Sequence, residues 1–450
     1  MKKVNIGRIL HDFSTWAIIS FLIVLCVGGL AAKNTARVPS TPVAEWSMFT
    51  SMQANNDLAE YAMYSIAHME SGMQRLNAVN VLVQWDDPAT GTIKRYKVVP
   101  GEMTDCGVLP KKQFIDPVAS VVEGARWMIT SYPAKRYIVV LWNHGSGVVD
   151  YETYRSPMSG LFFKDLRFKS PRIRPMLQDV LVPERGILYD DTYKRVLTNQ
   201  GLVQAMSTIK DLLGKKIDVV VMDACYMATY EVGYALRKSV SYLVASQEAE
   251  SGGGLPYGFF LYPLTMQPAA FDPMALAQTI VHSYQLFYQL KEGFEDYTYS
   301  AVDLTMYDEM KRNLDAMLKG VATCASLDAG KTKQIVKQAR AATHEMWWTV
   351  YVDLYSFYES LHQQVEQLLN ATKVGKRGAY EDGLGVLLPI LTEGMRLIRL
   401  SVVANAVGPV HGNCRGMCMY YPVKEPFHAS YRTTPFAIES AWEQFITTYC

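Results

Sequence analysis

Three short segments of this chain are apolar on both faces, a pattern typical of strands that are covered on two sides. They are residues 79–85 (VNVLVQW), 137–142 (YIVVLW) and 217–222 (IDVVVM). Patterns with a helical period separate and follow them, at 117–131, 198–213, 227–238 and 273–289,. Short β-branched strands that alternate with helices predict an α/β fold with a mostly parallel sheet flanked by helices. Further strands are predicted at 242–245 and 300–304.

The pattern changes along the chain, and this suggests a division into domains. Residues 37–50 begin with a Pro/Ser/Thr-rich stretch that predicts a linker, and an α/β domain is expected over 51–305,. Residues 306–450 predict a mainly helical C-terminal subdomain. Its expected helices are 308–323, 330–345, 353–369 and a last one near 436–449, with a strand-like segment at 416–422,.

The N-terminus predicts export from the cytoplasm. Lys2, Lys3 and Arg8 precede an uncharged apolar run at 16–32. Basic residues followed by an apolar run are typical of a secretory signal, and a run of this length is at the short limit for a membrane span. Residues 1–36 are therefore predicted to be a signal peptide or an uncleaved membrane anchor. Contact with a membrane is expected only through this segment, if it is not removed.

Charge and cysteine usage exclude some classes of protein. Lys and Arg number 44 against 43 acidic residues, so there is no basic excess, and no nucleic-acid partner is expected,. The seven cysteines are scattered and include no CxxC pair. Cys414 and Cys418 form a CxxxC pattern without a nearby HxxxH, which argues against a structural zinc site,.

Two of the predicted strands end in chemically distinctive residues, and a parallel sheet brings such ends to one edge. Asn-His-Gly-Ser-Gly follows 137–142, and Asp-Ala-Cys follows 217–222. Taken alone, Cys225 could be a small core residue and His144 a structural histidine. Together they form the minimal pair for nucleophilic catalysis, with Cys225 at the start of a predicted helix whose dipole favours the thiolate. The backbone N–H groups of Gly145 and Cys225 are candidate oxyanion donors.

These segments resemble those of a known family. VLWNHGSG and VVMDACYMATYEV are similar to the two catalytic segments of the clostripain family of cysteine peptidases, a member of the caspase-like clan. ILYDDT, YLVASQEAESGGGLPY, YSAVDL, MCMYYP and FAIESAWEQFITTY follow in the family's order. The resemblance covers most of residues 50–450. It implies a caspase-like sheet and a dyad of Cys225 and His144 that needs no third residue.

The resemblance also implies cleavage after Arg or Lys in protein or peptide substrates. Asp223 matches the position that the family places in the pocket for the basic side chain, and such a pocket needs a carboxylate. A helix N-cap is the alternative role for Asp223. Glu248 and Glu250 are candidates for a second carboxylate in the pocket, and the sequence does not show which of them points inward.

Two further expectations concern processing and calcium. Residues 149–185 predict a long basic loop between the catalytic strands. Because family members cleave themselves in this region, Lys164, Arg167 and Lys169 are predicted cleavage sites,. A plain surface loop with solvated charges is the alternative. No cofactor is required, but the family includes calcium-dependent members, and Asp190 and Asp191 form the acidic pair that could contribute to a calcium site,.

The sequence thus predicts a secreted or envelope-anchored cysteine endopeptidase. Two alternatives remain open at this point. One is a catalytically silent binding or scaffold protein on the same fold. The other is a clan-related transpeptidase, in which an amine captures the acyl-enzyme instead of water.

Overall fold

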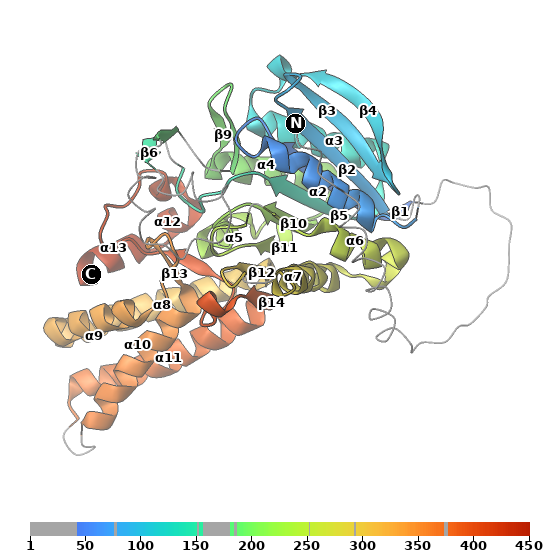
Figure 1. Cartoon of the computed structure of the whole chain (residues 1–450). Helices are drawn as coiled ribbons and strands as arrows, with labels where there is room; N and C mark the ends of the chain where they lie inside the picture. The colour runs from blue at the N-terminus through green and yellow to red at the C-terminus, as the bar shows by residue number, and fades with distance from the viewer. Residues whose placement is uncertain are drawn as a thin grey trace, which may run out of the picture. The chain divides into compact units, whose positions relative to one another are not determined.

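The structure is a computed structural model, and it describes residues 43–75, 79–150, 153–155, 181–183, 187–251, 253–291, 294–372 and 377–450. A nine-stranded sheet forms the centre of this part of the chain (Figure 1), in the order β14-β12-β11-β10-β5-β1-β2-β3-β4. The five central strands are parallel: β1 (Ala44–Gln53), β2 (Val79–Asp87), β5 (Ala134–Trp142), β10 (Ile217–Asp223) and β11 (Val240–Ala245). The outer strands are antiparallel: β3 (Thr92–Val99), β4 (Glu102–Pro110), β12 (Thr298–Asp303) and β14 (Val402–Val407). The predicted α/β fold with a mostly parallel sheet is confirmed.

Helices cover both faces of the sheet. One core joins the sheet to α3 (Pro117–Ser131), α4 (Asn199–Leu213) and α5 (Tyr230–Leu236), and the other joins it to α2 (Ala59–Gly72), α6 (Tyr257–Met266) and α7 (Pro273–Gln289). In β5, Val139 belongs to the first core and Val140 to the second, because successive side chains of a strand point to opposite faces,. This double burial explains why the central strands are apolar throughout.

Local capping signals fix the ends of the helices. The side chain of Thr198 accepts a hydrogen bond from the backbone N–H of Gly201 at the start of α4, and Gly214 ends this helix with a φ of 68°,. Asp116 and Asp272 cap α3 and α7 in the same way, each followed by a proline in the first turn,.

The linker predicted over residues 37–50 is wrong for its second half. Residues 44–50 belong to β1, which lies between β5 and β2 in the middle of the sheet. Its polar residues concealed the strand, but they are buried and bonded: the Ser47 hydroxyl donates to the carbonyl of Tyr132 at 2.6 Å and accepts from the Asn80 amide at 2.9 Å. A serine that finds such partners can occupy a buried strand without the cost of an unsatisfied hydroxyl.

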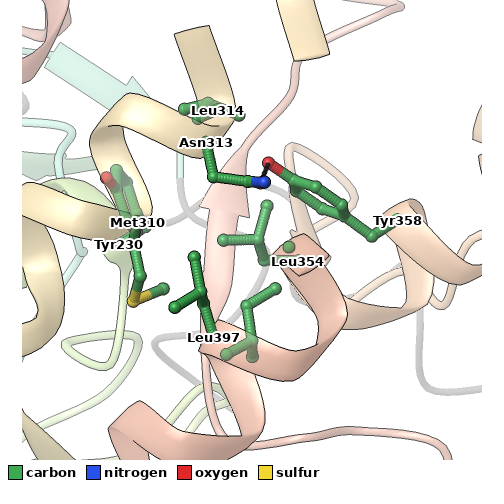
Figure 2. A pocket seen from close by; sticks show the side chains of 9 residues that line it. Tyr230, Met310, Asn313, Leu314, Leu354, Tyr358 and Leu397 are labelled. Atoms are coloured by element: carbon green, nitrogen blue, oxygen red, sulfur yellow. Dashed lines mark hydrogen bonds between the residues drawn. The ribbon is translucent and has the colours of Figure 1, made fainter. Parts of the chain in front are cut away.

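The region after β12 is mainly helical, as predicted. It contains α8 (Tyr307–Leu327), α9 (Ala329–Ala342), α10 (Leu354–Ala371), α11 (Ala379–Ser401), α12 (Pro435–Glu439) and α13 (Trp442–Tyr449). Two short strands, β13 (Tyr351–Asp353) and β15 (Cys418–Tyr420), pair with each other. A small apolar pocket lies between α8, α10, α11 and Tyr230 of α5 (Figure 2), where the Tyr358 hydroxyl donates to the Asn313 side chain at 3.1 Å. This pocket contains no nucleophile and no carboxylate among its lining residues.

Some predictions fall outside the described residues. The signal or anchor segment at 1–36 is among them, and so is most of the 149–185 loop, of which the structure describes β6 (Thr153–Arg155), β7 (Leu181–Pro183) and their antiparallel pairing. Among the described helices, none combines the length and the apolar character that a membrane crossing requires.

Candidate active site

The sheet brings the two predicted catalytic segments together. Strands β5 and β10 are parallel neighbours, and Trp142 at the end of β5 lies opposite Asp223 at the end of β10. Beyond them, the backbone N–H of Asn143 donates to the carbonyl of Asp223 at 3.2 Å. The Asn143 side chain also accepts from the backbone N–H of His144 at 2.7 Å, so it fixes the start of the loop that carries the imidazole.

Two glycines allow this loop to pack directly on the nucleophile segment. A Cβ added at Gly145 would overlap the carbonyl oxygen of Cys225 and lie 3.0 Å from the Cβ of Ala224. Gly147 has a φ of 64°, and the hydroxyl of Tyr351 occupies the space where its side chain would be. The Tyr351 hydroxyl also donates to the carbonyl of Ser146 at 2.6 Å. The His144 loop therefore rests against the backbone of Cys225.

Cys225 does not begin a helix, which corrects the prediction for residues 227–238. Helix α5 starts only at Tyr230, and the Thr229 side chain caps it. Residues 224–228 form a turn that is bonded to the loop after β11, since the N–H of Tyr226 donates to the carbonyl of Glu248 at 3.1 Å and that of Ala228 to Ser246 at 2.8 Å. The helix-dipole argument for a Cys225 thiolate therefore fails, and the alternative role of Asp223 as a helix cap fails with it.

The thiol of Cys225 is half-buried and lies beside the loop that follows β11. The backbone N–H of Glu250 donates to its Sγ at 3.2 Å. Tyr226, the next residue, has a φ of 60°, which is rare for a residue with a side chain,. Such strain is frequent at functional sites, where the surrounding contacts hold one residue in a costly conformation.

An aspartate that the sequence analysis did not identify contacts the histidine. Asp57, just before α2, has its Oδ1 2.6 Å from the Nε2 of His144. The His144 side chain is 8% exposed and the Asp57 side chain 41% exposed. A carboxylate in this position orients an imidazole and stabilises its charged form. The two residues are 87 positions apart, and an acid at the start of a helix is ordinarily interpreted as a cap.

A pair of buried carboxyl groups lies next to the nucleophile. Asp223 accepts hydrogen bonds from the Tyr257 hydroxyl at 2.7 Å and from the N–H of Leu255 at 3.1 Å. The Glu250 carboxyl is hydrogen-bonded to Asp223. Burial raises the pKa of both groups, and the adjacent Asp223 charge raises the pKa of Glu250 further, well above its ordinary value,. Both directions favour a proton held within the pair over two adjacent negative charges,.

Glu248 has a different environment from Glu250. Its Oε2 accepts from the backbone N–H of Trp347 at 2.6 Å, and its Oε1 accepts from the N–H of Ala249 at 2.8 Å. Its carboxylate thus fastens the 246–250 loop to the C-terminal region. Of the two candidates, Glu250 is the one that contacts Asp223.

The proposed calcium residues do not form a shared cluster of oxygen ligands. The Asp190 carboxylate is buried and contacts the Lys111 ammonium at 2.9 Å and the Asn55 amide at 2.7 Å. Asp191 is exposed and pairs with Lys194 at 3.1 Å. Because Lys111 already neutralises Asp190, this pair offers no set of free oxygens for calcium, and dependence on that ion stays a prediction.

Comparison with known proteins agrees with this geometry. The sequence model of the clostripain family matches residues 50–166 and 175–395. A secreted C11 cysteine protease from Bacteroides thetaiotaomicron, solved with an irreversible peptide inhibitor, is similar in structure with a TM-score of 0.58, 16% identity, and coverage of 90% of this chain and 98% of that one. An inactive zymogen C11 protease from Parabacteroides distasonis has a TM-score of 0.55 at 16% identity, with coverage of 91% and 99%. No curated protein sequence matches significantly.

The fold is an α/β fold with a mostly parallel sheet, and a cysteine and a histidine follow two adjacent strands of that sheet. The chain belongs to the clostripain family and is a cysteine peptidase.

Proposed function

We propose that this peptidase is an exported endopeptidase that cleaves after Arg or Lys through Cys225 and His144. The observation that carries the proposal is the buried Asp223–Glu250 carboxyl pair, because Asp223 is two residues from Cys225 and the backbone N–H of Glu250 donates to the Cys225 sulfur. The basic residues at the N-terminus, followed by the apolar run that ends at residue 32, support export,. The secreted relative from Bacteroides thetaiotaomicron is in keeping with it.

The residues present account for each step of acyl transfer. His144 accepts the proton of the Cys225 thiol, and the sulfur attacks the carbonyl carbon of the scissile bond. The N–H groups of Gly145 and Cys225 stabilise the oxyanion, and His144 then protonates the leaving amine. Water hydrolyses the thioester that remains. Asp57 holds the Nε2 of His144, so proton exchange with the substrate would use the other nitrogen of the ring.

The carboxyl pair favours a cationic side chain in the substrate pocket. Two buried carboxyl groups that share a proton form a site where an incoming ammonium or guanidinium can replace the proton of Glu250. Gly254 packs against this pair, and a Cβ there would lie 3.1 Å from the Oδ1 of Asp223. With an uncharged substrate side chain in the pocket, Asp223 would have no cationic partner. This difference gives the enzyme its preference for basic residues.

Fluorogenic peptides that differ only in the residue before the cut test this specificity. Wild type should cleave Arg and Lys peptides and leave norleucine and glutamine peptides almost uncut, and Cys225→Ala should cleave none. Asp223→Asn should lower kcat/KM for the Arg peptide by about 30-fold or more, because a buried charge loses its partner. Its effect on uncharged peptides should be small.

Glu248→Gln is the matched control, because this change keeps the size of a buried acid that lies outside the carboxyl pair. It should leave the ratio of Arg to norleucine cleavage unchanged. If Asp223→Asn cleaves the Arg peptide as well as wild type does, the pocket assignment is wrong. If wild type and Cys225→Ala are equally inactive on every peptide, the silent scaffold replaces the peptidase.

We further propose self-cleavage between the two catalytic segments. Lys164, Arg167 and Lys169 are the candidate sites, and they lie outside the described residues. The residues between β6 and β7 in the sequence contain them and offer the enzyme its own preferred residues,. The zymogen form solved for the relative from Parabacteroides distasonis supports an activation step in this family. The products would carry His144 and Cys225 on separate chains, held together by pairing of β5 with β10.

A further inference from the structure

Two histidines and a cysteine come together in the C-terminal region, apart from the residues of the proposed catalytic machinery. They are His344, between α9 and β13, and His411 and Cys414, which belong to one tight turn after β14. One ligand atom from each lies within 4.8 Å of the others, and the Nε2 of His344 is 3.2 Å from the Nδ1 of His411. His411 and Cys414 are buried, whereas His344 is half-buried and opens toward solvent.

These atoms nearly have the spacing of a tetrahedral zinc site. Zinc bonds of about 2.0 Å to nitrogen and 2.3 Å to sulfur give edges of roughly 3.3 Å between two nitrogens and 3.6 Å between nitrogen and sulfur. The observed separation between the His344 and His411 nitrogens is already that of one edge. The Cys414 sulfur lies within 4.8 Å of both histidines, so a small adjustment of its side chain would complete the triangle of ligands,.

A carboxylate contacts the nitrogen of His411 that is not the one next to His344. The Oδ1 of Asp296 is 2.6 Å from the Nε2 of His411. When Asp296 accepts the proton on Nε2, the lone pair of Nδ1 faces His344. Ligand histidines in metal sites nearly always make this contact, which fixes the tautomer and the orientation of the ring.

The backbone already holds the three residues in place. The N–H of Cys414 donates to the carbonyl of His411 at 2.8 Å, and its own carbonyl accepts from the Asn405 amide at 3.0 Å. On the other segment, the N–H of Asp353 donates to the carbonyl of His344 at 3.0 Å. Little ordering would therefore be needed on binding, which favours affinity.

The charge of the surroundings also favours a cation. Glu248 and Asp353 are buried carboxyl groups within electrostatic range of the Cys414 sulfur. Glu248 also acts electrostatically on His411. A zinc ion with two neutral imidazoles and one thiolate has a net charge of +1, and these acids outnumber the cation Arg415, which also acts on the Cys414 sulfur,.

We propose that His344, His411 and Cys414 bind one zinc ion, with water in the fourth position on the half-buried side of His344. Binding converts the Cys414 thiol into a zinc thiolate and releases its proton, so one proton leaves as one metal ion enters. The ion joins two segments that are 67 residues apart in sequence.

The site is connected to the nucleophile through the 246–250 loop. The N–H of Trp347 binds the Glu248 carboxylate, and the carbonyl of Glu248 accepts from the residue after Cys225. Zinc therefore fixes a segment that positions the catalytic thiol. We expect metal binding to raise the thermal unfolding temperature, and we expect its loss to lower the fraction of active enzyme.

Cobalt titration of the full-length Cys225→Ala protein tests the proposal, because this variant removes the catalytic thiol as a ligand. After chelation and dialysis, cobalt should give a stoichiometry of one, a sulfur-to-cobalt charge-transfer band and the visible bands of a tetrahedral site. Zinc should abolish these bands by displacement. Cys414→Ser should remove the charge-transfer band, and His344→Ala should weaken binding while the far-UV circular dichroism stays native.

Three controls make the result specific. Cys106→Ser and His282→Ala remove a cysteine and an exposed histidine outside the cluster, and both should bind cobalt as the parent does. Asp296→Asn should weaken binding by about 10- to 100-fold without removing the thiolate band. Absence of a one-to-one complex in the natively folded parent overturns the proposal. So does a thiolate band that survives Cys414→Ser, or one that Cys106→Ser removes.

Discussion

The contact between Gly145 and Cys225 makes a demanding test of the catalytic geometry, since Gly145→Ala adds one methyl group and no charge. The backbone of Gly145 does not have a positive φ, so alanine can adopt its conformation, and any effect must come from space. The added Cβ would meet the carbonyl oxygen of Cys225 well inside 3.0 Å, whereas ordinary van der Waals contact begins at 3.4 Å. Either the His144 loop or the Cys225 backbone must therefore move.

The displacement needed is on the order of 1 Å, a scale at which a misplaced catalytic group loses about 100-fold in rate. We expect kcat to fall by about this factor with little change in KM, because the substrate pocket around Asp223 is not touched. The Gly145 amide is also a proposed oxyanion donor, and its displacement acts in the same direction. Steady-state kinetics on the Arg peptide, together with the rate of thiol alkylation at Cys225, measure both consequences.

Gly385→Ala is the matched control. Gly385 is exposed in α11, and its added Cβ would meet nothing within 4 Å. This variant should keep full activity and gain slightly in stability, because alanine favours a helix. A Gly145→Ala enzyme that folds and retains wild-type kcat would refute the argument that the two segments are in tight contact.

Three further predictions concern other parts of the molecule. Asp57→Asn should lower kcat by about 10-fold at unchanged KM, and Asp57→Glu, which keeps the carboxylate, should restore part of the activity. Equal loss in both variants would mean that the charge of Asp57 does not act on His144. Burial raises the pKa of Glu231 to about 7, so the folded state holds this proton more tightly than the unfolded state does. The free energy of unfolding should therefore fall by roughly 3 kcal/mol as pH rises from about 4.5 to 7,. Glu231→Gln should remove that slope in denaturant titrations, and an unchanged slope contradicts the assignment. Purified wild-type protein should convert on storage to two fragments while Cys225→Ala stays whole; if both stay intact, or both are nicked alike, self-processing is wrong.

Sequence patterns predicted the elements whose side chains face apolar surroundings. The predicted helices 117–131 and 273–289 coincide with α3 and α7, because an Asp-Pro pair marks the start of each,. Strand β1 was missed because Ser47 and its polar neighbours depend on partners from distant segments. Helix α11 was missed because it contains three glycines and Pro389, which ordinarily interrupt helices,.

The site shows the same division. Cys225 and His144 follow predictable strands and are flanked by distinctive residues, so their approach could be inferred from sheet topology. Asp57 contacts His144 from a segment that belongs to neither strand. The helix expected after Cys225 was wrong because this segment forms hydrogen bonds with the 246–248 loop, and a helical period cannot reveal that competition. The residues missed are those held in place by segments far apart in sequence.

The short strand β13 explains why the peptidase needs its C-terminal region. The hydroxyl of Tyr351, its first residue, bonds the carbonyl of Ser146 in the His144 loop. The carboxylate of Asp353, its last residue, accepts from the Gln247 side chain at 2.9 Å in the loop beside Cys225. One three-residue strand thus fastens both loops of the site. A chain that ended at residue 305 would lose both hydrogen bonds, and a buried donor such as the Gln247 side-chain amide costs about 1–3 kcal/mol when it is left unsatisfied,. The region predicted as a separate subdomain therefore contacts both loops of the site, and we expect β1 through α13 to unfold as one cooperative unit.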